Sequence, residues 1–145
     1  MTASQTPTTA AGVRAWTPAQ RFAAVFGVVY LLVGVAGFAL TGVTDFSAHN
    51  HATLLIFAVN PLHNVIHLAL GVAWLAAAPW FRAARVANLV IGVVLGLVTV
   101  LGFVGVTDML GMSGFADPDN FLHLATATHA LYFGSVAAGG PDSRD

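Results

Sequence analysis

Long apolar segments separated by short polar stretches make up most of the chain. A helix needs about 20 residues to cross the hydrocarbon part of a bilayer. Four segments are long enough, at about residues 21–40, 54–80, 85–106 and 119–138. A spanning segment must satisfy its own backbone groups, and none of the four alternates polar and apolar residues as a barrel strand does. The pattern therefore predicts an all-α fold, a four-transmembrane-helix bundle over residues 19–139, with a polar cytoplasmic tail at 1–18 and a short cytoplasmic tail at 140–145.

Composition supports a membrane environment and excludes several kinds of chemistry. The chain of 145 residues is 57% hydrophobic and only 8% charged, whereas a soluble domain carries about 25% charged residues. Lipid is therefore expected to be its main solvent. The absence of cysteine excludes disulfides, thiolate metal ligands and iron–sulfur clusters. The net charge of −1 argues against nucleic acid as a partner, because nucleic acid needs a basic surface.

The charged residues predict an orientation in the membrane. All basic residues fall on one side of the four segments: Arg14, Arg21, Arg82, Arg85 and Arg144. The loops on the other side, about residues 41–51 and 107–118, contain Asp45, Asp108 and Asp117 but no basic residue. Cytoplasmic loops are the ones enriched in arginine and lysine. We therefore predict a multi-pass plasma-membrane protein with both termini in the cytoplasm.

The second segment is too long for one straight crossing, and Pro61 interrupts it. In one arrangement a single tilted helix is kinked at this proline. In the other, a short segment at residues 52–59 leads into a helix that has Asn60 as its N-cap and Pro61 in its first position. The kinked helix is the prediction that we favour.

Two short sequences recur and predict an internal repeat. Gly42-Val43-Thr44-Asp45 returns as Gly105-Val106-Thr107-Asp108, and Asn60-Pro61-Leu62-His63 is partly repeated in Asn120-Phe121-Leu122-His123. Two helical hairpins of the same orientation would be related by an axis along the membrane normal, as in a parallel repeat. In that arrangement His63 and His123 face one another across the axis.

Polar residues inside the second and fourth segments are expected to point into the bundle. His63 and His67 are four residues apart and so lie one turn apart on one helix face. Polar groups are costly in hydrocarbon unless they find partners, so this face should turn inward. The predicted polar core, in the outer half of the bundle, consists of Asn60, His63, Asn64, His67, Asn120, His123 and His129.

Several roles for these histidines remain open from the sequence. We favour a non-enzymatic role, structural or in binding a membrane-protein partner or a second copy, with the imidazoles hydrogen-bonded to neighbouring asparagine and threonine side chains. In an alternative, His63, His67 and His123 bind a transition metal, or imidazoles from two helices bind haem in a redox component. A proton-coupled conduit is a further alternative. No motif for a catalytic nucleophile is present, so we expect no enzymatic activity.

The stretch from Leu54 to Gly71 resembles a bacterial family of small four-helix membrane proteins known only as a domain of unknown function. The hallmark of that family is similar to Asn-Pro-x-His-Asn-x-x-His-x-x-x-Gly, which begins here at Asn60, and a second feature is similar to Asp119-Asn120-Phe121-Leu122-His123. The resemblance covers about residues 21–138 and implies the fold and topology but no activity. It singles out Asn60, His63, Asn64, His67 and His123, whereas His129 and the loop residues His49 and His51 fall outside the pattern.

Overall fold

A computed structural model describes residues 15–46, 52–112 and 114–140, and this part of the chain is mostly helical. Its elements are α1 (Pro18–Thr41), β1 (Ala52–Leu54), β2 (Phe57–Val59), α2 (Pro61–Ala77), α3 (Phe81–Phe103), the 3₁₀ helix η1 (Asp108–Leu110) and α4 (Pro118–Gly134). The predicted helical fold with four main helices is confirmed. Most of the two predicted tails, and the loop residues His49 and His51, lie outside the described residues.

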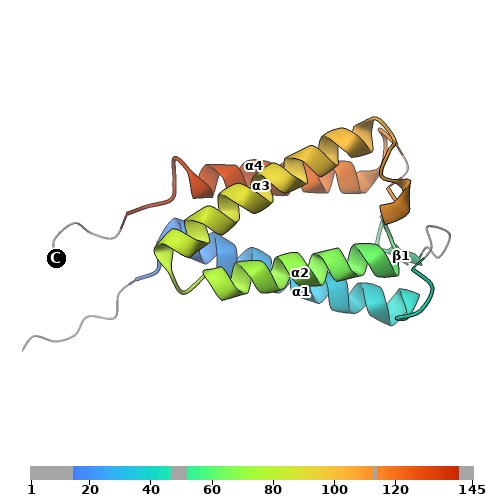
Figure 1. The fold of residues 1–145 in the computed structure, drawn as a ribbon, viewed down its shortest axis with the longest axis horizontal. Helices are drawn as coiled ribbons and strands as arrows, with labels where there is room; N and C mark the ends of the chain where they lie inside the picture. Colours follow the sequence, from blue (N-terminus) through green and yellow to red (C-terminus); the bar gives the residue numbers. More distant parts are fainter. Residues whose placement is uncertain (1–14, 47–51, 113, 141–145) are drawn as a thin grey trace, which may run out of the picture.

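The helices form two hairpins (Figure 1). α1 packs mainly against α2, and α3 mainly against α4. The short strands and η1 lie at one end of the molecule, which we call the β-hairpin end. The connection between α2 and α3 lies at the opposite end, the turn end, together with the start of α1 and the end of α4. α3 rises away from α2 toward the β-hairpin end, so the two hairpins are closest together at the turn end.

Three of the helices begin with a capping residue followed by proline. The Thr17 side chain caps α1 and forms a capping box with Gln20, and the Asp117 side chain caps α4. Proline is well suited to the first helical position because its missing N–H would have no partner there. Thr17-Pro18 and Asp117-Pro118 are therefore the sequence signals for the starts of α1 and α4.

The third such start lies in α2, where the favoured prediction is wrong. No kinked helix runs from residue 54, because residues 52–59 form an antiparallel β-hairpin and the helix begins at Pro61. A proline ring clashes with the carbonyl four residues earlier in a helix and forces the preceding residue into an extended conformation. Asn60 is extended, with φ −136° and ψ 169°, and its Oδ1 accepts a hydrogen bond of 2.9 Å from the N–H of His63. The chain therefore adopts the second predicted arrangement.

The two hairpins share a recurring contact between a glycine and an asparagine. A methyl group on Gly37 would collide with Oδ1 of Asn64, and one on Gly102 would collide with Oδ1 of Asn120. Each glycine therefore lets an amide oxygen approach its Cα closely, in the manner of a weak Cα–H···O contact. Gly27 with Leu75 and Gly92 with Leu131 repeat a second glycine contact between the same pairs of helices.

This recurrence changes the register of the predicted repeat. Because Asn64 and Asn120 occupy equivalent places, the residues that follow them by three positions, His67 and His123, are also equivalent. The repeat therefore relates His67, and not His63, to His123, although the rings of His63 and His123 do lie close together, with centroids 5.8 Å apart. The two matching tetrapeptides do not occupy equivalent positions, because Asn60 caps its helix, whereas Asn120 lies inside the first turn of α4.

At the turn end, buried polar groups are paired and hold the two hairpins together. Asn88 of α3 is fully buried. Its Oδ1 accepts a hydrogen bond of 3.0 Å from Nε1 of Trp74, and its Nδ2 donates one of 3.1 Å to the carbonyl of Ala19. Arg85 donates from Nε to the carbonyl of Gly134 at 2.9 Å. These bonds tie α3 to each of the other three helices around a core of aromatic and alanine side chains.

A candidate metal centre

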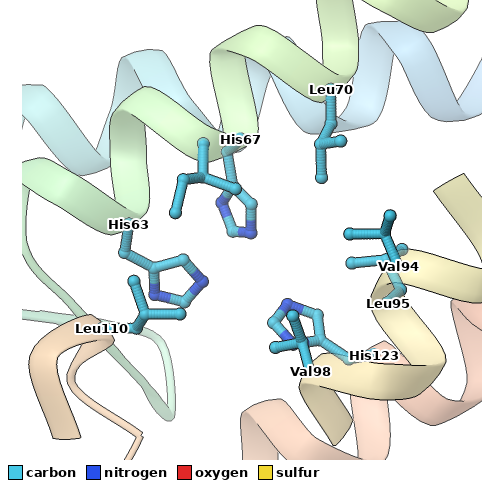
Figure 2. A pocket seen from close by; sticks show the side chains of 9 residues that line it. His63, His67, Leu70, Val94, Leu95, Val98, Leu110 and His123 are labelled. Carbon is cyan, nitrogen blue, oxygen red and sulfur yellow. The ribbon is translucent and has the colours of Figure 1, made fainter. Parts of the chain in front are cut away.

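Three histidines meet between the two hairpins, toward the β-hairpin end (Figure 2). His63 and His67 come from α2 and His123 from α4, and each is at most 4% exposed. One ring nitrogen from each lies within 4.8 Å of the corresponding nitrogens of the other two. The ring centroids are 4.4 Å apart for His63 and His67, and 5.8 Å and 6.1 Å from these two to His123. The structure thus brings His123 to two histidines that lie 56 and 60 positions before it in the sequence.

Local structure positions each imidazole. The cap at Asn60 fixes the first turn of α2, so that His63 lies in that turn and His67 lies one turn further on the same face. The Tyr30 ring of α1 packs edge-on against His67 with a centroid distance of 5.0 Å. The close contact between Gly102 and Asn120 brings the first turn of α4 against α3 and sets the depth of His123.

Most nitrogens of these rings lack hydrogen-bond partners within the described residues. Both nitrogens of His63, Nδ1 of His67 and both nitrogens of His123 are buried and unpaired. The carbonyls of Ala58 and Leu110 lie close to His63 but without the geometry of a hydrogen bond. An unsatisfied buried polar group costs about 1–3 kcal/mol. Asn88 and Trp74 at the turn end are paired, so the unpaired nitrogens distinguish the histidine cluster from that end of the interior.

The predicted hydrogen bonds between the imidazoles and the neighbouring asparagines are wrong. Asn60 donates from Nδ2 to the carbonyl of Met109 at 2.9 Å, which fastens η1 to the start of α2. Asn64 donates to Oγ1 of Thr41 at 2.9 Å, and Asn120 donates to the carbonyl of Gly114 at 2.8 Å. The amides therefore secure loops and helix ends around the cluster, and they leave the histidine rings unpaired.

His129 does not belong to the cluster, contrary to the prediction. It is exposed on α4, and its Nδ1 lies 2.7 Å from the carbonyl of Ala125 in the same helix. Six residues along a helix correspond to a rotation of about 240°. A residue six positions after His123 therefore faces away from the interior side of α4.

A cavity of about 60 Å³ adjoins the three imidazoles. The other side chains around it are all aliphatic and come from α2, α3 and η1: Ile66, Leu70, Val94, Leu95, Val98 and Leu110. In Figure 2 the imidazoles of His63 and His67 enter from α2 and that of His123 from α4, while Leu70, Val94 and Leu95 line the remaining part of this space. The site therefore combines nitrogen donors with an apolar lining.

Two carboxyl groups near the start of α4 accompany the cluster. Asp117 and Asp119 are 8% and 1% exposed, and Oδ1 of Asp117 accepts a hydrogen bond of 3.0 Å from the N–H of Asp119. Asp117 is close enough to His63 and His123 to interact electrostatically with both. Oδ2 of Asp119 is buried without a hydrogen-bond partner in the described residues. The sequence did not identify Asp117 as a neighbour of the cluster, because an Asp-Pro pair signals a helix start and gives no indication of what packs beside it.

These features define a class of small helical protein in which two hairpins enclose a histidine cluster. The chain belongs to the family described as Domain of unknown function (DUF4383), whose family model matches residues 20–136. The matched region contains all three converging histidines and both buried aspartates. No curated protein and no solved structure matches the chain.

Proposed function

We propose that this protein is an integral membrane protein that binds one divalent transition-metal ion through His63, His67 and His123. The observation that carries the proposal is the set of unpaired ring nitrogens that three buried imidazoles direct toward one another. A metal ion that accepts one nitrogen from each ring would replace three unsatisfied buried groups by three coordinate bonds.

The surfaces of α1 and α3 support the membrane environment. Both helices are long and apolar enough to cross a bilayer, yet only 28% and 33% of their most apolar windows are buried in the protein. The core helix of a soluble protein would be mostly buried. Leu32 and Val35 of α1, and Leu97 and Val100 of α3, are among the large apolar side chains exposed instead. Lipid is the solvent that such surfaces fit. α2 and α4 have 17 residues each, near the lower limit for a crossing.

The charges support an orientation with both termini in the cytoplasm. Described arginines lie at the turn end, namely Arg21, Arg82 and Arg85, whereas Asp45, Asp108, Asp117 and Asp119 lie toward the β-hairpin end. The end rich in arginine is the cytoplasmic one in membrane proteins. Four crossings then place the β-hairpin end outside the cell and the histidine cluster in the outer half of a four-helix bundle.

Cysteine labelling in cells tests the membrane topology, because the natural chain has no cysteine. Phe115 and Val136 are exposed near the β-hairpin end and the turn end, respectively. We expect a membrane-impermeant maleimide to label Phe115→Cys in intact cells and Val136→Cys only after the membrane is permeabilised. The reverse pattern would contradict the orientation. Recovery of both variants in the soluble fraction would contradict the membrane assignment.

The donor set indicates which metals fit. Three neutral imidazoles without a thiolate suit borderline divalent ions such as Zn²⁺, Co²⁺ or Fe²⁺. Tetrahedral coordination at about 2.1 Å brings ligand nitrogens to roughly 3.4 Å from one another. The three ring nitrogens lie within 4.8 Å of one another. Metal binding therefore requires side-chain movements of about an ångström. Asp117 interacts electrostatically with His63 and His123, so its carboxyl group would offset part of the charge of the ion.

The other candidate roles are less well supported. A cavity of about 60 Å³ is small beside the roughly 300–1,000 Å³ of typical cofactor pockets, so it does not suit haem. A purely structural polar core would be expected to pair its imidazoles with other side chains, and these nitrogens are unpaired. A proton conduit needs a chain of polar groups, whereas the side chains that line the rest of the cavity are aliphatic.

Cobalt titration of the detergent-purified full-length protein tests metal binding. We expect one Co²⁺ per chain, with visible absorption bands of the intensity typical of a four-coordinate ion. Loss of an outer-shell partner costs a metal site about 10–100-fold in affinity, so loss of a ligand in His67→Ala should cost at least about 100-fold. His129→Ala is the matched control and should bind as the natural protein does. Absence of stoichiometric cobalt, or equal binding by His67→Ala, would contradict the proposal.

A further inference from the structure

The three imidazoles line only part of the cavity, and aliphatic side chains line the rest. In Figure 2, His63 and His67 approach from α2 and His123 approaches from α4, while Leu70, Val94 and Leu95 line the part of the cavity that no imidazole reaches. A zinc-like ion takes four ligands, and sites with three protein ligands keep the fourth position for an exchangeable molecule. The lining residues other than histidine are aliphatic and offer no further donor. The open position of a bound ion would therefore face the aliphatic part of the cavity.

We propose that this cavity binds a small ligand of two or three atoms, which coordinates the metal at its open position. This inference rests on the proposed metal site and adds to it the class of molecule that the site takes. The ligand forms one bond to the metal in place of a coordinated water, and no other bond is broken.

Size and polarity define that class. The volume of about 60 Å³ accommodates the ion together with a ligand only a few atoms long. The aliphatic wall, with Ile66, Leu95 and Val98, cannot donate hydrogen bonds. Oxyanions such as phosphate or a carboxylate would lose their hydrogen bonds to water without replacement there. Three neutral imidazoles add no negative charge, so a divalent ion keeps a net positive charge even beside Asp117, and that charge favours a compact monoanion.

The experiment uses azide as a probe of the open position in the cobalt-loaded full-length protein. We expect azide to change the visible spectrum with a saturating, one-to-one dependence on concentration. Val98 of α3 lines the cavity, so Val98→Phe should fill it and weaken azide binding at least 10-fold while one Co²⁺ per chain is retained. Val100 of the same helix is exposed, so Val100→Phe is the matched control and should bind azide like the natural protein.

The possible results separate this inference from the metal site itself. Failure to load cobalt would overturn both. One Co²⁺ per chain with no spectral response to azide would overturn the ligand site alone, as would an azide affinity unchanged in Val98→Phe. If Val98→Phe does not fold, Val98→Ile adds a single methylene at the same place and should weaken azide binding several-fold. An unchanged affinity in Val98→Ile would then overturn the inference.

Discussion

Replacement of His123 by leucine is expected to make the metal-free protein more stable. The buried ring of His123 has two nitrogens without hydrogen-bond partners in the described residues. Leucine has a similar volume and removes both unsatisfied groups, and the adjoining cavity can accommodate the difference in shape. Each unsatisfied group costs about 1–3 kcal/mol, so the free energy of unfolding should rise by about 1–3 kcal/mol in the presence of a chelator. Unfolding in mixed detergent, followed by circular dichroism, measures this change.

Asn88→Leu at the turn end is the control for this prediction. Asn88, in α3, is buried like His123, but both its Oδ1 and its Nδ2 are hydrogen-bonded, to Trp74 and to Ala19. Its replacement leaves the Trp74 N–H unpaired and should lower the free energy of unfolding by about 1–3 kcal/mol. Opposite signs in the two variants would distinguish a binding site from a structural polar core. A comparable loss of stability in His123→Leu would show that the imidazole is structural.

Saturation with metal is expected to stabilise the natural protein by a large amount. A ligand at 1,000 times its dissociation constant, bound only by the folded state, adds about 4 kcal/mol. For a chain of 145 residues this corresponds to a rise in Tm of about 10 °C or more. A thermal melt with Co²⁺, with and without chelator, measures the shift. His129→Ala should show the same shift and His123→Leu none, whereas an equal shift in His123→Leu would place the metal elsewhere.

Hydropathy alone located most of the fold. α1, α3 and α4 lie within a few residues of the predicted segments, because each is a continuous apolar stretch whose ends are marked by a cap, a proline or a glycine. The same reasoning failed at residues 52–59, which are equally apolar but form strands. Hydropathy reports the solvent of a segment and not its backbone conformation. The conformation there is decided by Pro61 and by the short loop between β1 and β2.

The candidate site was only partly predictable, for a different reason. Helical periodicity placed His63 and His67 on one face, and the cost of polar groups in lipid placed that face inward. Neither helical periodicity nor the cost of polar groups in lipid predicts the hydrogen-bond partner of each asparagine. Asn60 is paired with η1 and Asn120 with the loop at Gly114, which are contacts of loops that periodicity does not describe. The unpaired state of the imidazoles, on which the metal proposal rests, follows from those contacts.

X-ray absorption spectroscopy at the cobalt edge of the loaded, detergent-purified protein tests the metal centre most directly. We expect a first shell that contains three imidazole nitrogens at about 2.0–2.1 Å, with the multiple scattering that histidine rings produce. The signal should lose one imidazole in His123→Leu and remain unchanged in His129→Ala. A shell of oxygen ligands without imidazole scattering would contradict metal binding by His63, His67 and His123.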